Sequence, residues 1–262
     1  MKKLLALFLA LLLAVSATAA LAEGNFTDEM KIPYSVDLSE EDGADSVERL
    51  GDHPDSPYFR HPDFYNMTST DTLTILTGFK TYQQTSEWSC GVVSALMVLN
   101  YFGALGEYDE ESLSALRSVG LTSGRGGVEP SSTSLLQMID IYEGVGGFEL
   151  YSTIDCGDEV EEMMTLDTIR QFLAEGMPIM VGWNDWGGHW QVIIGYDTMG
   201  TETEQDDVII VADPYDTTDH NQDGYGIYPA ERFIYNFTFY DFFDEEAGDG
   251  NFMQFLVANV IE

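Results

Sequence analysis

Residues 84–102 read QTSEWSCGVVSALMVLNYF and hold the strongest structural signal in the chain. From residue 91 to residue 102 the side chains are apolar almost all round, without a polar face. That pattern is typical of a helix buried on every side in a protein core. Cys90 stands at the N-terminal end of this helix, where unpaired amides and the helix dipole favour negative charge. The stretch therefore predicts a central helix that begins at a cysteine.

The sequence around this helix predicts a sheet and further helices. Alternating or apolar runs indicate strands over residues 72–76, 179–183, 189–196, 208–212 and 252–260. Helices are expected over residues 132–142 and 166–175, and an aromatic segment over residues 225–243 is expected to pack in the core. Because the helices come mainly before an antiparallel sheet, the fold class is expected to be α+β, with the N-terminal buried helix packed on the sheet.

The N-terminus predicts export. MKKLLALFLALLLAVSATAALA, residues 1–22, places two lysines before an apolar run and ends in small residues, as in a secretory signal peptide. The apolar stretch is shorter than the roughly 20 residues that cross a bilayer. We therefore expect cleavage, a secreted extracellular protein, and no membrane partner after cleavage.

Two regions follow the signal peptide. Cleavage leaves 262 − 22 = 240 residues, which suits one large domain with an N-terminal extension. Residues 23–70 are acidic and rich in turn formers, so they are interpreted as an extension or propeptide; a clasp on the domain remains an open alternative. Residues 71–262 are expected to form the ordered domain.

The charge balance bears on the partners. The chain has 46 acidic and 10 basic residues, a net charge of −36, and its 44% hydrophobic content is ample for a core. Such a charge repels phosphate backbones and anionic membranes, so no nucleic acid partner is expected. Solubility outside the cell is the simplest reason for the charge.

The chain has only two cysteines, Cys90 and Cys156. In an exported protein they could form a disulfide. The alternative is catalytic: a cysteine attacks as the thiolate, and a histidine can take the thiol proton and later return it to a leaving amine. Cysteine count alone leaves both interpretations open.

His189 is the best candidate for that histidine. His53 and His61 lie in Pro-rich coil and are interpreted as surface residues, while His220 lies in an Asp-rich loop where a metal or solvent role is open. His189 opens the strand sequence HWQVIIGYD. Its position at the start of the strongest strand favours a role in a site.

The hairpin after His189 predicts its partner. If the turn centre falls near residue 201, residues opposite one another have numbers that sum to about 402, and 189 + 213 = 402. Opposed side chains point to one face of a sheet, so Asp213 is expected to orient His189 and stabilise its charged form. A bulge would change this register.

Gln84 completes the candidate site. A glutamine amide and the backbone N–H of the nucleophile can bind the oxyanion of a tetrahedral intermediate. Gln84 stands six residues before Cys90, Cys90-Gly91 opens the apolar helix, Gly188-His189-Trp190 begins a strand, and another strand ends in Ala212-Asp213-Pro214. With these motifs, residues 72–215 resemble the papain-like cysteine peptidases, most closely the bacteriocin-leader-processing peptidase-like family and its stand-alone secreted members.

The resemblance implies a papain-like fold for residues 71–262 and a role for each motif residue. Cys90 would be the nucleophile, His189 the general base and acid, Asp213 the orienting residue and Gln84 the oxyanion donor. A peptide or protein would be the substrate, and no cofactor would be required. The transporter helices and ATPase of leader-processing proteins have no counterpart in this sequence, so cleavage of a double-glycine leader is not implied.

Two other functions remain open. A cell-wall amidase or peptidoglycan endopeptidase can use the same Cys-His chemistry, and a catalytically silent papain-like domain could bind a partner. The presence of all four motif residues argues against the silent domain. Cys156 would be a spare thiol or a redox lock on Cys90.

A calcium site is a secondary candidate. Asp219, Asn221, Asp223 and Gly224 occupy the first, third, fifth and sixth positions of a calcium-loop pattern. The twelfth position is Ala230, with Glu231 one residue late, and such a run is also ordinary turn chemistry. Both interpretations of the Asp219–Asp223 loop stay open.

Overall fold

The computed structural model describes residues 28–46, 62–118, 132–185, 187–217, 222–238 and 252–261. The signal-peptide prediction for residues 1–22 lies outside these ranges, as do His53, His61 and His220.

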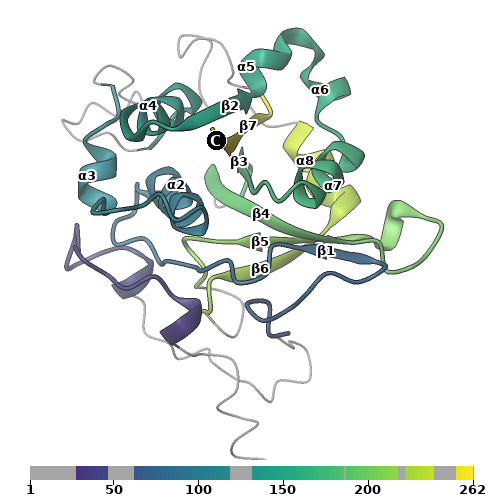
Figure 1. Ribbon diagram of the computed structural model, residues 1–262, viewed down its shortest axis with the longest axis horizontal. Coiled ribbons are helices and arrows are strands. Elements are labelled where there is room, and N and C mark those ends of the chain that lie inside the picture. The colour runs from purple at the N-terminus through teal and green to yellow at the C-terminus, as the bar shows by residue number, and fades with distance from the viewer. Residues whose placement is uncertain are drawn as a thin grey trace, which may run out of the picture.

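An antiparallel sheet forms the centre of the described structure (Figure 1). Its order is β2-β7-β3-β4-β5-β6, and β1 pairs with β4 beside this path. The strands are β1 (Leu73–Ile75), β2 (Phe148–Ser152), β3 (Ile179–Trp183), β4 (His189–Asp197), β5 (Val208–Ala212), β6 (Tyr225–Pro229) and β7 (Gln254–Val260). β3 and β4 are buried along almost their whole length because neighbouring strands and helices cover them.

The helix α2 (Cys90–Tyr101) confirms the main prediction. Its residues from Cys90 to Leu99 are buried, and it contacts β4. The helix ends at Tyr101, with Phe102 as its C-cap, one residue before the predicted end. The α+β class, with a buried helix on an antiparallel sheet, is therefore confirmed.

The other helices are α3 (Glu110–Ser114), α4 (Leu135–Val145), α5 (Thr153–Cys156), α6 (Val160–Met163), α7 (Leu166–Ala174) and α8 (Ala230–Thr238). The predicted helix over residues 132–142 begins later, at Leu135, because Ser134 caps it: the Ser134 hydroxyl accepts from the Gln137 amide, and the Gln137 side chain accepts from the Ser134 amide. Short 3-10 turns occur at Asp28–Met30, Ala44–Ser46, Gly157–Glu159 and Glu204–Asp206.

Two parts of the sheet were not predicted. The aromatic segment after residue 225 divides into the strand β6 and the helix α8, with Phe233 and Phe237 buried. β2 lies between helices in sequence and pairs with β7, the last strand, from far along the chain. The local sequence of residues 148–152 does not identify this strand, because it is stabilised by pairing with the distant strand β7.

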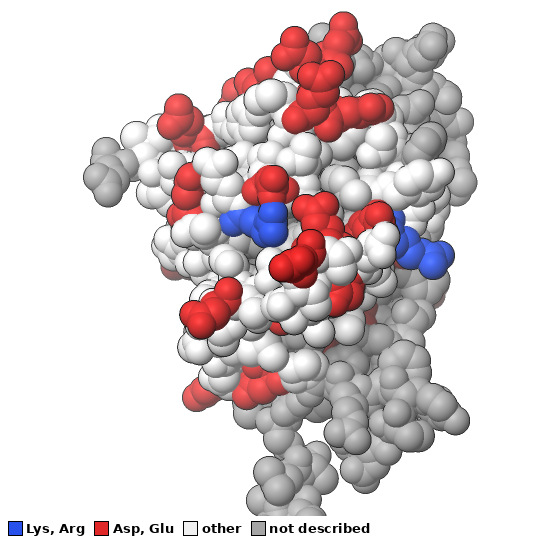
Figure 2. Space-filling view, turned by 90° about the vertical axis from the view of Figure 1, so that its right-hand side faces the viewer, with Lys and Arg blue, Asp and Glu red and all other residues white. Residues whose placement is uncertain are grey.

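The surface is strongly acidic. The face drawn in Figure 2 carries Asp and Glu side chains across much of its area and Lys or Arg at only a few places. No helix in the described part of the chain is long and apolar enough to cross a bilayer.

Candidate active site

Cys90 lies buried at the first position of α2. Ser89 precedes it but makes no side-chain capping bond to the helix. Its hydroxyl is instead engaged with Ser86, accepting from the Ser86 hydroxyl at 2.8 Å. The N-terminal amides of α2, which carry a partial positive charge, are therefore not bound by a capping side chain next to Cys90.

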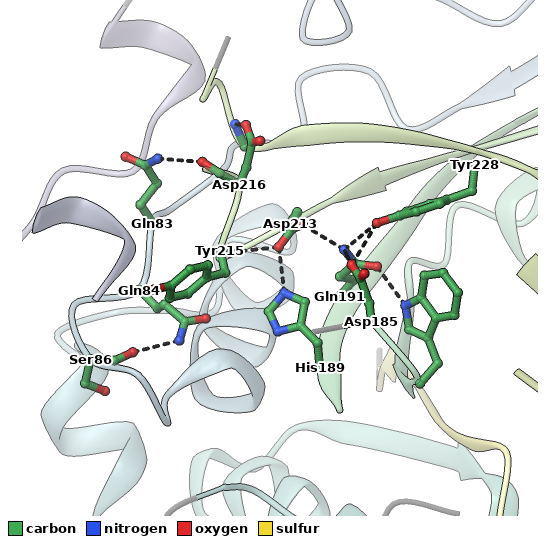
Figure 3. A network of polar contacts seen from close by, with 12 residues as sticks. Gln83, Gln84, Ser86, Asp185, His189, Gln191, Asp213, Tyr215, Asp216 and Tyr228 are labelled. Carbon is green, nitrogen blue, oxygen red and sulfur yellow. Dashed lines mark hydrogen bonds and ion pairs between the residues drawn. The ribbon is translucent and has the colours of Figure 1, made fainter. Parts of the chain in front are cut away.

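His189 and Asp213 form a buried pair (Figure 3). His189 Nε2 lies 2.7 Å from Asp213 Oδ1, which also accepts the Tyr215 backbone N–H at 2.7 Å. Because Nε2 is occupied, Nδ1 is the ring nitrogen left for Cys90, which lies close enough to the ring to raise the pKa of His189. The structure thus brings His189 and Asp213 into contact as the sequence predicted, and the roles assigned to Cys90, His189 and Asp213 stay predictions.

Electrostatics favour the charged form of the His189–Asp213 pair. Burial acts to lower the pKa of His189, but the Asp213 carboxylate and Cys90 outweigh it and raise that pKa to about 10. Burial acts to raise the pKa of Asp213, while His189 and the hydrogen bonds from Tyr215 and Gln191 hold it below its usual value. The pair is therefore an imidazolium and a carboxylate at neutral pH.

The predicted hairpin register is wrong, although the contact that it implied is present. Val192 pairs with Ala212, so opposed residues near the site sum to 192 + 212 = 404, not 402. A bulge between Ile193 and Gly195 changes the sum to 195 + 210 = 405 beyond it. Near the site the error is two residues, which keeps the side chains there on their predicted face, so His189 still reaches Asp213 diagonally across the two strands.

Gln191 is a site residue that the sequence prediction missed. Its Nε2 donates to Asp213 Oδ2 at 2.7 Å, and its Oε1 accepts the Trp183 Nε1–H at 2.8 Å. The same Nε2 lies 3.1 Å from the Tyr228 hydroxyl and from Asp185 Oδ2, and Tyr228 donates to Asp185 at 2.9 Å (Figure 3). The available signal was strand periodicity, because residue 191 shares a face with residue 189.

Gln84 is held next to the strand end that bears Asp213. Its backbone N–H donates to Pro214 O at 2.9 Å. Its side chain is 1% exposed, and Nε2 donates to Ser86 O at 2.7 Å. Its Oε1 accepts no hydrogen bond among the described residues. One amide hydrogen of Nε2 remains for a ligand, as the oxyanion role requires.

Arg117 is a second group that sequence analysis missed. Its guanidinium lies 4.7 Å above the Trp88 ring, and it donates to Thr133 Oγ1 at 2.9 Å and to Ser114 O at 3.1 Å. Burial lowers its pKa to about 10, and the charge of Cys90 opposes that shift. Among the described residues it has no carboxylate partner within ion-pair distance.

Thr133 links Arg117 to the strand that begins at His189 and to the helix that begins at Cys90. The Thr133 carbonyl accepts a hydrogen bond of 2.7 Å from the indole N–H of Trp190, the residue that follows His189. Its side chain packs against Gly91, where an added Cβ would lie 2.7 Å from Thr133 Cβ. A glycine after Cys90 therefore permits this close approach, and any larger side chain would push Thr133 away.

Cys156 is not bonded to Cys90. Both thiols are free. Cys156 lies at the end of α5, and its Sγ is 3.1 Å from the hydroxyl of Tyr151. The disulfide alternative is thus absent from this structure, and a redox role for Cys156 stays a prediction.

The calcium prediction is only partly covered, because Asp219 and Asn221 lie outside the described residues. The Asp223 carboxylate accepts the Tyr225 backbone N–H at 2.9 Å, which is turn chemistry. In the part of the chain that is described, no group of three or more His, Cys, Asp or Glu residues could hold a metal ion.

Cys90, His189 and Asp213 therefore lie together at the start of α2 and the ends of β4 and β5, with Gln84 next to Asp213. The model of the Peptidase_C39 like family matches residues 76–238, and the chain belongs to that family. The resemblance stated from the sequence is thereby confirmed.

Two solved structures resemble the chain. One is assigned as a C39-like peptidase of Bacillus anthracis. It shares 16% sequence identity with this chain at a TM-score of 0.48, and the match covers 73% of this chain and 100% of that chain. The other is a double glycine motif protease from an AMS/PCAT transporter in complex with the leader peptide. It shares 15% sequence identity with this chain at a TM-score of 0.38, and the match covers 69% of this chain and 91% of that chain. No curated protein sequence matches the chain.

Proposed function

We propose that the protein is a secreted cysteine peptidase that hydrolyses peptide bonds through a thioester intermediate. The observation that carries this proposal is the buried His189–Asp213 pair, with Nε2 2.7 Å from Oδ1, together with the position of Cys90 at the start of α2, from which it raises the pKa of His189. Membership of the Peptidase_C39 like family supports the same chemistry.

The first half of the reaction forms the acyl-enzyme. In the resting site the proton of Cys90 already lies on His189 Nδ1, and the Cys90 thiolate attacks the carbonyl carbon of the scissile bond. The carbonyl electron pair moves to oxygen, where the second Gln84 Nε2 hydrogen and the Cys90 backbone N–H stabilise it. When the intermediate collapses, the C–N bond breaks and His189 gives its proton to the leaving amine.

The second half releases the acid. His189, now neutral, takes a proton from water, and the hydroxide attacks the thioester carbon. The C–S bond breaks, Cys90 leaves as the thiolate, and the His189–Asp213 pair returns to its charged form. Asp213 orients the ring and stabilises its charge throughout without itself taking the proton.

The proposed location and partners follow from the sequence. The lysines, apolar run and small residues of positions 1–22 support export and cleavage. Membership of the Peptidase_C39 like family supports a peptide or protein substrate, and the acidic surface (Figure 2) disfavours nucleic acid. No cofactor takes part in the proposed steps.

The test is selective alkylation of Cys90. In a Cys156→Ser background, Cys90 is the only thiol. We expect iodoacetamide at about pH 6 to label it faster than a free thiol, and His189→Ala to slow labelling by about tenfold or more, because the proton acceptor is lost. Labelling that is slow in the parent protein and indifferent to His189 would refute an activated cysteine.

Substrate digestion then separates the candidate functions. Labelled casein should be cleaved by the mature protein and not by Cys90→Ser. Cleavage of purified peptidoglycan without cleavage of casein would favour the amidase or endopeptidase. Rapid labelling of Cys90 with neither reaction would favour the silent binding domain.

A further inference from the structure

The segment before the family match packs on the domain as part of its core. Residues 28–46, drawn in purple in Figure 1, precede the matched region, which begins at residue 76. Met30, Ile32 and Ala44 are buried. The Ile32 N–H donates to Thr81 O and the Thr81 N–H donates to Met30 O, each at 2.9 Å. The segment is thus bonded to the chain that leads into the Gln84 loop.

The same segment holds the backbone of Gln84 itself. The Ala44 N–H donates to Gln84 O at 2.9 Å, while the Gln84 N–H donates to Pro214 O at 2.9 Å. The two polar backbone groups of Gln84 are therefore held from opposite ends of the chain. One partner follows Asp213, and the other belongs to the N-terminal segment.

The next residue, Thr85, is bound in a second way. The Leu38 N–H donates to Thr85 Oγ1 at 2.9 Å, and that hydroxyl donates to Glu110 Oε2 at 2.7 Å. Glu110 also accepts the Thr85 N–H at 3.1 Å and is fully buried. The segment therefore completes the hydrogen bonding of the Thr85 hydroxyl. Without the segment, this hydroxyl would lose the Leu38 N–H that donates to it.

Gly43 shows how closely the segment approaches the loop. Its φ is +98°, and an added Cβ would lie 2.6 Å from the Thr85 carbonyl carbon and 2.8 Å from the Ser86 nitrogen. Its N–H donates to Glu87 Oε1 at 3.3 Å. Only glycine fits both the backbone conformation and the contact.

We propose that residues 28–46 are a positioning segment of the mature enzyme: they hold the Gln84 loop in the geometry that oxyanion binding needs, and they are not removed as a propeptide. The inference rests on the proposed function, because the oxyanion role of Gln84 belongs to it. An oxyanion donor must lie within hydrogen-bond distance of the developing charge, so a loop held from one side only would lose much of its effect.

The first test removes one hydrogen bond. Ala44→Pro lacks the N–H that binds Gln84 O, and Ala44→Ser is the control that keeps it. In the mature chain we expect Ala44→Pro to lower kcat for labelled casein by about tenfold or more with little change in KM. Alkylation of Cys90 should stay within about twofold, because displacement of iodide at a saturated carbon forms no oxyanion.

A double-mutant cycle shows whether the effect passes through Gln84. Once Gln84→Ala has removed the amide, adding Ala44→Pro should cause no further loss of kcat. Additive losses, or equal losses of kcat and of Cys90 alkylation, would mean general structural damage and would overturn the proposal. So would a normal kcat in Ala44→Pro.

Two measurements do not depend on activity. Ala44→Pro should speed hydrogen exchange of the Gln84 amide and leave that of the Val93 amide, bonded to Ser89 O within α2, unchanged. N-terminal sequencing should show that the secreted protein begins before residue 28, and a secreted protein that begins after residue 46 would overturn the proposal. If the unmutated protein neither labels at Cys90 nor cleaves casein, the peptidase function fails, and the exchange result still decides whether residues 28–46 hold the loop.

Discussion

His189 Nε2 and Asp213 Oδ1 lie 2.7 Å apart, although the strand register does not place the two residues opposite one another. The carboxylate reaches the ring diagonally, and Gln191 occupies its other oxygen at 2.7 Å. One carboxylate thus links the histidine to a partly buried polar network of Gln191, Tyr228 and Asp185 (Figure 3).

Asp213→Asn should lower kcat by about 10²- to 10⁴-fold, because an amide cannot stabilise the imidazolium that general acid–base catalysis requires. Steady-state kinetics on casein would measure the loss. The matched control is Asp207→Asn, since Asp207 accepts the Tyr196 hydroxyl at 2.5 Å at the other end of the same strands. The control should change stability but not kcat; equal effects of both variants would contradict the assigned role.

The His189–Asp213 pair should stabilise the fold in a defined pH range. The pKa of His189 is raised from 6.5 to about 10, so its contribution is complete below about pH 6.5 and lost as the pH rises toward 10. The pKa of Asp213 is lowered from 3.8, so its contribution is present above that value and lost as the pH falls below it.

Urea unfolding of the unmutated protein and Asp213→Asn from about pH 4 to pH 10 would measure this contribution as the difference in unfolding free energy. We expect the difference to be largest between the two ordinary pKa values, 3.8 and 6.5, and to shrink above them. A difference that grows above neutral pH would contradict the charged pair.

Gln191→Met should lower kcat by about tenfold with an unchanged KM, because Asp213 loses a hydrogen bond that orients it. Gln191→Glu should instead lower Tm, because it places a third carboxylate against Asp213 and Asp185. The pH profile of Cys90 alkylation distinguishes a positioning role from general damage: it should shift in Gln191→Met. A normal kcat and profile would show that Asp213 does not need this partner.

Arg117→Met should slow Cys90 alkylation several-fold at about pH 6 and much less at high pH, because a buried cation favours the thiolate. Arg117→Lys should recover part of the rate. Arg170→Met is the control: its guanidinium lies 5.4 Å above the Tyr196 ring, and Cys90 is not among its charged neighbours. If both methionine variants behave alike, Arg117 has no specific effect on the thiol.

Much of the fold was predictable because its central elements carry local signals. The helix α2 and the strands β3, β4 and β5 are apolar runs that can be recognised from the local sequence. Their bounds match the prediction closely. β2 and β6 are different. They are partly exposed strands whose identity comes from pairing with β7 and β5, which local sequence does not encode.

The sequence alone was sufficient to propose Gln84, Cys90, His189 and Asp213 as the site, because their chemistry, their spacing and the family resemblance restrict the choice. Tertiary structure decided how they are held. A bulge in β4 changes the register, Gln191 and Arg117 reach the site from positions without a motif, and residues 28–46 bind the Gln84 loop from the other end of the domain. These contacts join segments far apart in the chain, so only the folded arrangement specifies them.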